Sequence, residues 1–360
     1  MKKRGKLWLG CILVVCIISI SVGVVSATKK TNNKTTTKTT VNDQKKQIVT
    51  DNKKKGGVEV KMAAQKESTT PKTLQTCLKD TNYDVPNDFW TRKSDVTYGE
   101  VKDIQYNSTA TKTTRNAKVI LPAGYTTEKK YPVLYLIHGI GGDENTLYND
   151  NVNNVIGNAI ASGDAEKMIV VLPNACANTT GKPPKDASGK DLFFALEHYQ
   201  AYDNFLNDFK DCLMPYINKN FSAATGRENT AIAGFSMGGR VSLHIGFSMT
   251  DSIRYIGGFC PAFGILEYSN NGVHENGLFI EKDFILPEKY MNDTLVLIVA
   301  GKKDAIVRDE PQRYNNALTA NGVPHIYYET MGGVNNTGSG EHSGDVYKHG
   351  LYNFMRRIFH

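Results

Sequence analysis

A serine stands at the centre of a short glycine-rich segment, Gly234-Phe235-Ser236-Met237-Gly238-Gly239. The apolar run at 230–235 leads into it, and a helical pattern follows at once. A G-x-S-x-G pattern between a strand and a helix is typical of a serine nucleophile held on a sharp turn. A side chain two residues before or after Ser236 would collide with the neighbouring strand and helix, so glycine is needed there. The spacing therefore predicts nucleophilic catalysis by Ser236.

A serine nucleophile needs a general base, usually a histidine that a carboxylate orients. His342 lies in the glycine-rich loop Gly338-Ser339-Gly340-Glu341-His342-Ser343-Gly344, between the last expected strand and the last expected helix. Such a loop can bring an imidazole over the serine, so we expect His342 to be the base. His349, in the following amphipathic helix, is the alternative, and His244 and His325 are expected to be structural.

Asp304 is the expected acid, because it comes just after the strongly apolar run Leu295–Ala300. The carboxyl end of a strand is where such an acid belongs when the chain order is serine, acid, histidine. Asp309 and Glu310 follow at the start of a helix, where acidic residues commonly pair with the helix terminus. The three expected residues together predict acyl transfer.

Acyl transfer creates an oxyanion that two preorganised N–H groups must stabilise. One should come from Met237, the residue after the nucleophile. The second should come from the loop after an early strand, where Tyr135-Leu136-Ile137 runs into His138-Gly139-Ile140-Gly141-Gly142. We expect Ile140 to supply this donor and His138 to hold the loop. Direct catalysis by His138 and a merely flexible strand exit are the alternatives.

These residues require a sheet that gathers them at one edge. From about Thr81 onward, short apolar runs alternate with amphipathic stretches, which indicates an α/β fold. Several runs are continuously apolar, which is typical of a mostly parallel sheet covered by helices on both faces. The expected strands are 117–121, 133–137, 168–172, 230–235, 255–259, 295–300 and 325–329. The expected helices are 152–161, 202–218, 237–247, 311–321 and 345–358.

The positive charge of the chain is confined to its N-terminal part. The net charge is +7, yet residues 1–66 hold 15 Lys and Arg against 3 Asp and Glu, whereas residues 67–360 hold 28 against 33. The body is therefore mildly acidic, which argues against nucleic acid as a partner.

Residues 1–27 are expected to direct export. Basic residues precede an apolar run from Leu7 to Val25, and Val25-Ser26-Ala27 offers the small residues that signal peptidase prefers. An uncleaved membrane anchor is the alternative, because the run approaches the roughly 20 residues that span a bilayer. The Thr/Lys/Asn-rich stretch 28–75 predicts a disordered linker, with contact to an anionic cell-surface polymer as an alternative role. Residues 76–360 form the expected catalytic domain of a secreted or surface-tethered protein.

Four cysteines lie outside the export segment, namely Cys77, Cys176, Cys212 and Cys260. In an exported protein they could form a disulfide, and four cysteines allow three sets of pairings. Cys212 follows Phe205 and Phe209 at helical spacing, which favours a buried free thiol there. No Cys/His spacing predicts a zinc site.

The segments YPVLYLIHGIGGDENT, TAIAGFSMGGR, LIVAGKKDAIV and GEHSGDVYKHGLYNF resemble, in this order, the feruloyl and acetylxylan esterases of carbohydrate esterase family 1, within the esterase D-like α/β-hydrolases. The resemblance covers roughly residues 82–358. It implies an α/β-hydrolase fold and no cofactor. It also implies a triad of Ser236, Asp304 and His342, with Ile140 and Met237 as oxyanion donors.

The activity implied by the resemblance is release of feruloyl or similar hydroxycinnamoyl groups from plant xylan. Deacetylation of xylan, and hydrolysis or transfer of another acyl group by the same machinery, are the alternatives. The sequence departs from the family pattern at Thr146-Leu147-Tyr148 and at the inserted Asn335-Asn336-Thr337-Gly338, both near the expected substrate site. The aromatic residues of 261–287 either wall a pocket for a planar acyl group or pack in the core: Phe263, Tyr268, Phe279 and Phe284.

Overall fold

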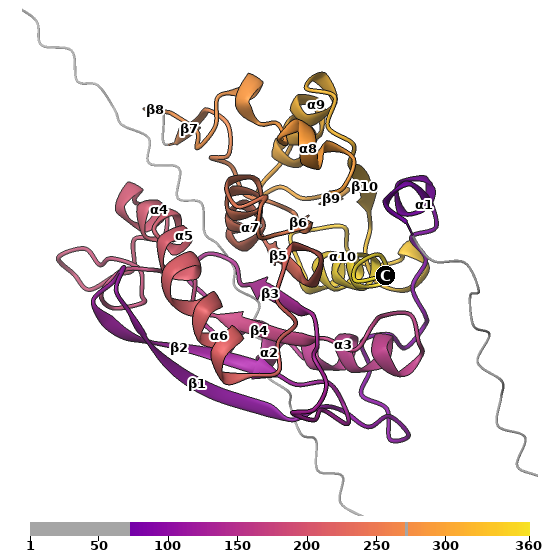
Figure 1. Ribbon diagram of the computed structural model, residues 1–360. Coiled ribbons are helices and arrows are strands. Elements are labelled where there is room, and N and C mark those ends of the chain that lie inside the picture. Colours follow the sequence, from indigo (N-terminus) through magenta and orange to yellow (C-terminus); the bar gives the residue numbers. More distant parts are fainter. Residues whose placement is uncertain (1–72, 271–272) are drawn as a thin grey trace, which may run out of the picture. The chain divides into compact units, whose positions relative to one another are not determined.

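The computed structural model describes residues 73–270 and 273–360 (Figure 1). The expected export segment, 1–27, and all but the last three residues of the expected linker, 28–75, lie outside the described residues. The described chain opens with α1 (Leu74–Lys79), which Thr73 caps by accepting a hydrogen bond from the Thr76 amide. Within these residues, none of the helices has both the length and the apolar character needed to cross a membrane.

An eight-stranded sheet forms the centre of the described body, in the order β1-β2-β4-β3-β5-β6-β9-β10. The strands are β1 (Val101–Ser108), β2 (Thr113–Ile120), β3 (Val133–Ile137), β4 (Ile169–Pro173), β5 (Thr230–Phe235), β6 (Tyr255–Phe259), β9 (Leu295–Gly301) and β10 (Ile326–Thr330). The pairs from β4 to β10 are parallel, whereas β2 runs antiparallel to both β1 and β4. A separate hairpin pairs β7 (Tyr268–Asn270) with β8 (Val273–Glu275).

Helices cover both faces of the sheet (Figure 1). They are α2 (Thr146–Asn149), α3 (Val152–Ala161), α4 (Leu196–Asp203), α5 (Phe205–Asp208), α6 (Met214–Asn220), α7 (Met237–Ser248), α8 (Glu288–Met291), α9 (Glu310–Ala320) and α10 (Gly344–Met355). In Figure 1, α4 to α7 lie on one side of the sheet, and α3 and α10 lie on the other. The expectation of a mostly parallel sheet covered on both faces is confirmed.

Two hydrophobic cores fill the space between the sheet and the helices. On β3, Tyr135 and Ile137 belong to the core beneath α4 to α7, whereas Leu134 and Leu136 belong to the core beneath α3 and α10. This division follows from the strand geometry, because successive side chains point to opposite faces. A strand buried on both faces must be apolar at every position, which explains the continuous runs in the sequence.

The stripe Phe205, Phe209, Leu213 and Ile217 is fully buried, as the helical spacing predicts. The helical region is not uniform, however. It begins earlier than predicted, at Leu196, and Phe209–Leu213 forms a π turn in which the Met214 amide donates to the Phe209 carbonyl, five residues back. Pro215 has no N–H to donate, so one α-helical hydrogen bond is absent at this point in any case. The helix can therefore adopt the wider turn here without losing that bond.

The expected strands and helices are all present, with ends that differ by a few residues. The sequence patterns missed β1, which lies at the edge of the sheet with mixed exposure, as well as α1 and the β7–β8 hairpin. Cys176, Cys212 and Cys260 are buried free thiols, so no pairing exists among the four cysteines. The free thiol favoured for Cys212 is confirmed, with the Thr109 amide 3.3 Å from its sulfur.

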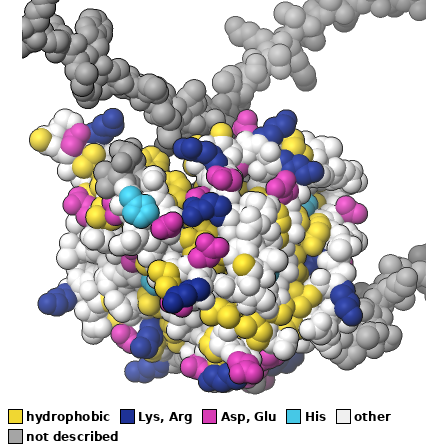
Figure 2. All heavy atoms as spheres, turned by 90° about the horizontal axis from the view of Figure 1, so that it is seen from above, with side chains coloured by type: hydrophobic (Ala, Val, Ile, Leu, Met, Phe, Trp, Pro, Cys, Tyr) yellow, Lys and Arg dark blue, Asp and Glu magenta, His cyan; other side chains and the backbone are white. Residues whose placement is uncertain are grey.

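The surface seen from above in Figure 2 carries acidic and basic side chains interspersed with one another. A surface that binds a nucleic-acid backbone presents its Lys and Arg together on one face. The described face shown in Figure 2 lacks such a basic patch, in agreement with the mildly acidic composition of the body.

Candidate active site

Ser236 joins β5 to α7 in a backbone conformation with φ of 59° and ψ of −120°. A Cβ added at Gly238 would lie 2.2 Å from the Ile137 carbonyl oxygen, and one added at Gly234 would lie 2.4 Å from the Gly238 carbonyl oxygen. Both distances are far below van der Waals contact, so the steric reason predicted for the two glycines is confirmed. The Ser236 amide also donates to the Phe259 carbonyl of β6 at 2.9 Å, which ties the turn to the sheet.

Asp304 and His342 form a hydrogen-bonded pair, with 2.7 Å between His342 Nδ1 and Asp304 Oδ2. The second carboxylate oxygen of Asp304 accepts from the Ile306 and Val307 amides at 2.9 and 3.1 Å. Burial alone would raise the pKa of the Asp304 carboxyl, but the hydrogen bond and charge of His342 and the two amides outweigh it and hold the pKa below its ordinary value. Asp304 is therefore ionised at neutral pH and fixes the proton of His342 on Nδ1, which leaves Nε2 to accept a proton.

The His342 loop is anchored beside the serine turn. The Lys303 amide donates to the Gly340 carbonyl at 2.7 Å, and the Gly340 amide donates to the Met331 carbonyl at 2.8 Å. The His342 ring packs on Phe235, the residue before the serine, with 4.5 Å between ring centroids. The structure thus pairs Asp304 with His342 and places the His342 ring against the residue that precedes Ser236.

The inserted residues before the histidine motif form a closed turn. The Asn336 side chain accepts hydrogen bonds from the Thr330 hydroxyl and the Met331 amide, at 2.8 and 2.5 Å. Asn335 and Asn336 both have positive φ, a conformation that asparagine tolerates better than most residues. These hydrogen bonds hold this part of the loop to the end of β10.

One group of side chains in the described ranges has the composition of a metal site. Cys260 Sγ, an Asp304 carboxylate oxygen and a His342 ring nitrogen lie within 4.8 Å of one another. Burial, together with the neighbouring Asp304, raises the pKa of the Cys260 thiol well above its ordinary value, so the sulfur stays protonated. Asp304 and His342 are hydrogen-bonded to each other, so the group consists of this pair beside a buried thiol.

Met237 and the loop after β3, which are expected to supply the oxyanion donors, both lie next to Ser236. Met237 is the first residue of α7, and an amide in the first helical turn has no partner within the helix. A Cβ added at Gly139 would lie 3.4 Å from Ser236 Cβ, which places the β3 loop directly against the serine. Ile140 follows Gly139, so its amide belongs to the part of the loop nearest the serine.

His138 is buried and holds the loop from below, as expected for a structural histidine. The Ala175 amide donates to His138 Nε2 at 2.9 Å, and His138 Nδ1 donates to the Gly139 carbonyl at 2.7 Å. Burial lowers the pKa of His138 to about 4. The ring is therefore neutral, and both of its nitrogens are occupied within the fold.

The alternative catalytic residues are engaged elsewhere. His349 is buried on α10 with its Nδ1 3.1 Å from the Tyr328 hydroxyl, and burial lowers its pKa to about 4. Burial also lowers the pKa of His244 to about 4, and its ring packs on Phe279. Glu310 forms an ion pair with Arg313 on α9.

Of the four aromatic residues in the 261–287 segment, Tyr268 and Phe284 are buried, whereas Phe263 and Phe279 are only partly buried. Phe284 is fully buried and packs on Phe247 of α7 with 4.4 Å between centroids. Phe263 and Tyr268 stack against Tyr199 of α4, each with 6.0 Å between centroids.

Comparison with known proteins identifies the family. The Esterase family, described as "Putative esterase", matches residues 108–336. A solved structure of a CE1 ferulic acid esterase from Anaeromyces mucronatus, in complex with ferulic acid, is 35% identical, with a TM-score of 0.69. The match covers 78% of this chain and 98% of that chain. This chain is a member of carbohydrate esterase family 1. As a member of this family, it is a serine carboxylic ester hydrolase with an α/β-hydrolase fold.

Two curated relatives are similar to part of this family 1 esterase. The "Endo-1,4-beta-xylanase Y" of Acetivibrio thermocellus is 29% identical over 171 residues, which make up 44% of this chain and 14% of that protein. The "Endo-1,4-beta-xylanase/feruloyl esterase" of Xylanibacter ruminicola is 29% identical over 172 residues, 45% of this chain and 22% of that protein. The match therefore spans less than a quarter of either relative.

Sequence patterns singled out candidate residues and the loop after β3 in this family 1 esterase but missed one residue that contacts the loop. The Tyr202 hydroxyl accepts from the Gly141 amide at 3.0 Å and donates to the Gly139 carbonyl at 3.3 Å. Tyr202 lies 63 positions from Gly139 in the chain and belongs to no motif. Its apolar neighbours on the helix gave it the pattern of an ordinary core residue.

Proposed function

We propose that this esterase releases feruloyl or related hydroxycinnamoyl groups from the arabinose side chains of plant xylan. The observation that carries the proposal is the 35% identity over nearly the whole length of an esterase whose structure holds ferulic acid. The name of the Xylanibacter relative, which joins a xylanase to a feruloyl esterase, supports a xylan-bound substrate. The conclusion is a feruloyl esterase with Ser236 as nucleophile, His342 as base and Asp304 as the orienting acid.

In the proposed acylation step, Ser236 Oγ attacks the ester carbonyl carbon while its proton passes to His342 Nε2. The carbonyl oxygen becomes an oxyanion, which the Ile140 and Met237 amides stabilise. Asp304 keeps the imidazole in the required tautomer and balances the positive charge that it acquires. Collapse of the tetrahedral intermediate breaks the bond to the sugar oxygen, and His342 returns the proton to that oxygen.

Deacylation follows the same route with water as the nucleophile. His342 takes a proton from water, the hydroxide attacks the acyl-enzyme carbonyl, and the proton returns to Ser236 Oγ as the bond breaks. The products are the free hydroxycinnamic acid and the intact enzyme. No cofactor or redox step is required by this sequence of events.

The proposed site of action is outside the cell. The basic residues, apolar run and small residues of 1–27 support export, and the lysine-rich stretch that follows supports a tether at the cell surface. Cell fractionation followed by sequencing of the N-terminus of the exported protein tests this. A chain that begins after Ala27 supports cleavage, an intact N-terminus in the membrane fraction supports the anchor, and retention in the cytoplasm contradicts export.

The substrate proposal is tested with feruloylated and acetylated arabinoxylan, with free ferulate and acetate measured in the same reaction. We expect ferulate release by the purified chain, loss of release in Ser236→Ala, and normal release in Ser248→Ala, which changes an exposed serine at the far end of α7. Acetate alone would assign the enzyme to acetylxylan. Hydrolysis of a small activated ester without either product would contradict the xylan substrate but keep the mechanism.

A further inference from the structure

The peptide that joins Gly139 to Ile140 is held by three donors on one side. The Gly139 carbonyl accepts from His138 Nδ1 at 2.7 Å, from the Gly142 amide at 3.1 Å and from the Tyr202 hydroxyl at 3.3 Å. In a planar trans peptide, the carbonyl of one residue and the N–H of the next point in opposite directions. The groups that hold the Gly139 oxygen therefore also set the direction of the Ile140 N–H.

Tyr202 bridges two parts of this loop with one hydroxyl. It accepts from the Gly141 amide and donates to the Gly139 carbonyl, so the residues on both sides of Ile140 are fixed to α4. Tyr202 is fully buried, and burial raises the pKa of its hydroxyl, so the group remains a donor at any working pH.

His138 links the same carbonyl to the segment after β4. Its Nε2 accepts from the Ala175 amide, and the residues on either side of Ala175 are held in turn by Arg115. The Arg115 guanidinium donates to the carbonyls of Asn174 and Cys176, the latter at 3.1 Å. These contacts fix the peptide whose N–H orients the imidazole.

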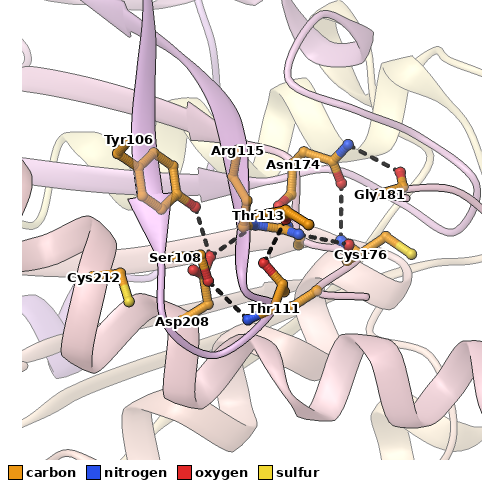
Figure 3. A network of polar contacts seen from close by, with 12 residues as sticks. Tyr106, Ser108, Thr111, Thr113, Arg115, Asn174, Cys176, Gly181, Asp208 and Cys212 are labelled. Atoms are coloured by element: carbon orange, nitrogen blue, oxygen red, sulfur yellow. Dashed lines mark hydrogen bonds and ion pairs between the residues drawn. The ribbon is translucent and has the colours of Figure 1, made fainter. Parts of the chain in front are cut away.

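Asp208 and Tyr106 complete the support from the opposite side of Arg115 (Figure 3). Arg115 Nε lies 3.0 Å from Asp208 Oδ2, and the Tyr106 hydroxyl donates to the same oxygen at 2.6 Å. The side chains of Arg115 and Asp208 are only 3% and 0% exposed. A buried ion pair is weak evidence for a stabilising role, because apolar residues of similar size often serve stability equally well.

We propose that Tyr202, together with His138 and the Arg115–Asp208–Tyr106 network, forms a brace that aims the Ile140 N–H at the developing oxyanion. The brace residues are positioning residues, since each is buried and acts through the loop. This inference rests on the proposed catalytic role of Ser236 and of the Ile140 amide. Because an oxyanion donor acts mainly in the transition state, a loosened brace lowers kcat while KM changes little.

Tyr202→Phe is the mildest test, because it removes one hydroxyl and keeps the buried ring. We expect kcat to fall about tenfold to a hundredfold, somewhat less than the loss of a whole oxyanion donor, with KM within about threefold. The matched control is Tyr352→Phe, which removes the hydrogen bond from a buried tyrosine of α10 to Asp164. The control is expected to keep wild-type kcat at a similar thermal stability.

The double variant Arg115→Met/Asp208→Leu tests the distant end of the brace. It removes the buried charges together, so neither is left unpaired. We expect a folded protein with kcat lowered about threefold to tenfold. Affinity for an arylboronic acid, whose tetrahedral adduct with Ser236 presents an oxygen to the amides, should fall in parallel, whereas affinity for ferulate should not.

If Tyr202→Phe kept the wild-type kcat and the wild-type affinity for the boronic acid, the proposed brace would be overturned. This conclusion would hold whatever the double variant showed. A loss of kcat in the Tyr352→Phe control as large as in Tyr202→Phe would also overturn it, because the effect would then follow general stability. Full activity in Ser236→Ala would instead overturn the proposed catalytic site itself. The two failures are therefore distinguishable.

Discussion

The two sides of the active site are built differently. On the nucleophile side, Ser236, Asp304 and His342 follow three parallel strands, and short motifs surround each of them. On the oxyanion side, the loop after β3 depends on residues from β2, α4 and α5 that lie far apart in the sequence. The residues proposed to react are therefore marked by local patterns, whereas the groups that hold the loop are brought together only by the fold.

The difference follows from what each side must do. A nucleophile turn imposes a strained conformation and close backbone contacts, which only certain residues satisfy, so it leaves a pattern in the sequence. A supporting hydrogen bond can come from any element that reaches the loop. Such support is specified by tertiary structure and leaves no fixed spacing.

The largest expected effect is on the nucleophile side. Asp304→Asn should lower kcat by about 10⁴-fold, because the amide no longer holds the proton of His342 on Nδ1. The fold should persist, since an amide oxygen can still accept from the Ile306 and Val307 amides. Steady-state kinetics together with thermal denaturation measures both. If Asp304→Asn lowered kcat no more than the brace variants do, the two sides of the site would not differ in their effect on catalysis.

The steric demand of the serine turn can be measured with two neighbouring glycines. Gly234 and Gly258 are cross-strand partners, but a Cβ at Gly234 would meet a backbone oxygen at 2.4 Å, whereas the nearest atom at Gly258 would be 3.5 Å away. Gly234→Ala should lower the free energy of unfolding by about 2–3 kcal/mol and reduce kcat, and Gly258→Ala should change either quantity little. Urea denaturation provides the comparison, and equal effects at both positions would contradict it.

Buried histidines on both sides predict a loss of stability at acid pH. Burial lowers the pKa of His138, His244 and His349 from 6.5 to about 4. Between these values the unfolded chain binds more protons than the folded one, so the free energy of unfolding falls as pH falls from about 6.5 towards 4. A fully buried histidine contributes a slope of about 1.4 kcal/mol per pH unit in this window.

Urea denaturation at several pH values measures this slope. His349→Gln should reduce the slope of the free energy of unfolding with pH by the contribution of about one proton. The control His274→Gln, at an exposed position of the β7–β8 hairpin, should leave it unchanged. An unchanged slope in the His349 variant would show that this histidine does not contribute.

The smallest effect is expected from an ion pair of the β1–β2 hairpin in which only the acid is exposed. Asp103 pairs with Lys118 on the same two strands that carry Tyr106 and Arg115. The Asp103 side chain is 80% exposed, whereas that of Lys118 is 8% exposed. Asp103→Asn should change the free energy of unfolding by less than about 1 kcal/mol and leave kcat unchanged. A change in kcat here would mean that any perturbation of the hairpin reaches the loop, and it would weaken the specific role of the brace.

Much of the fold was predictable because burial leaves a periodic pattern. Continuous apolar runs indicated β3, β4 and β9, and a four-residue stripe indicated the helical region that ends at Asn220. Strand β1 was missed because it lies at the edge of the sheet and buries only Tyr106 and Ser108. The π turn was missed because side-chain spacing reports which face is buried and not which carbonyl accepts each amide.

The candidate site likewise has a part that could be predicted from the sequence and a part that could not. Ser236, Asp304 and His342 were predicted from motif, strand end and loop composition, and the structure pairs Asp304 with His342 and packs His342 on Phe235. The contact of Arg115 with Asp208 joins residues 93 positions apart, and neither stands in a pattern that marks it. Only the topology that places β2 beside α5 makes their pairing visible.

The π turn at Phe209–Leu213 limits how the length of the chain can vary in this region. Each residue of an α-helix turns the next by about 100°, so the phase of a helix depends on the number of residues before it. Tyr202 and Asp208 precede the wide turn, and the buried Ile217 follows it. Deleting one residue within the turn would restore regular α-helical winding. It would also rotate either Tyr202 and Asp208 or Ile217 away from the residues that they contact. Single-residue gaps should therefore be selected against here, even where substitutions of the exposed positions are tolerated.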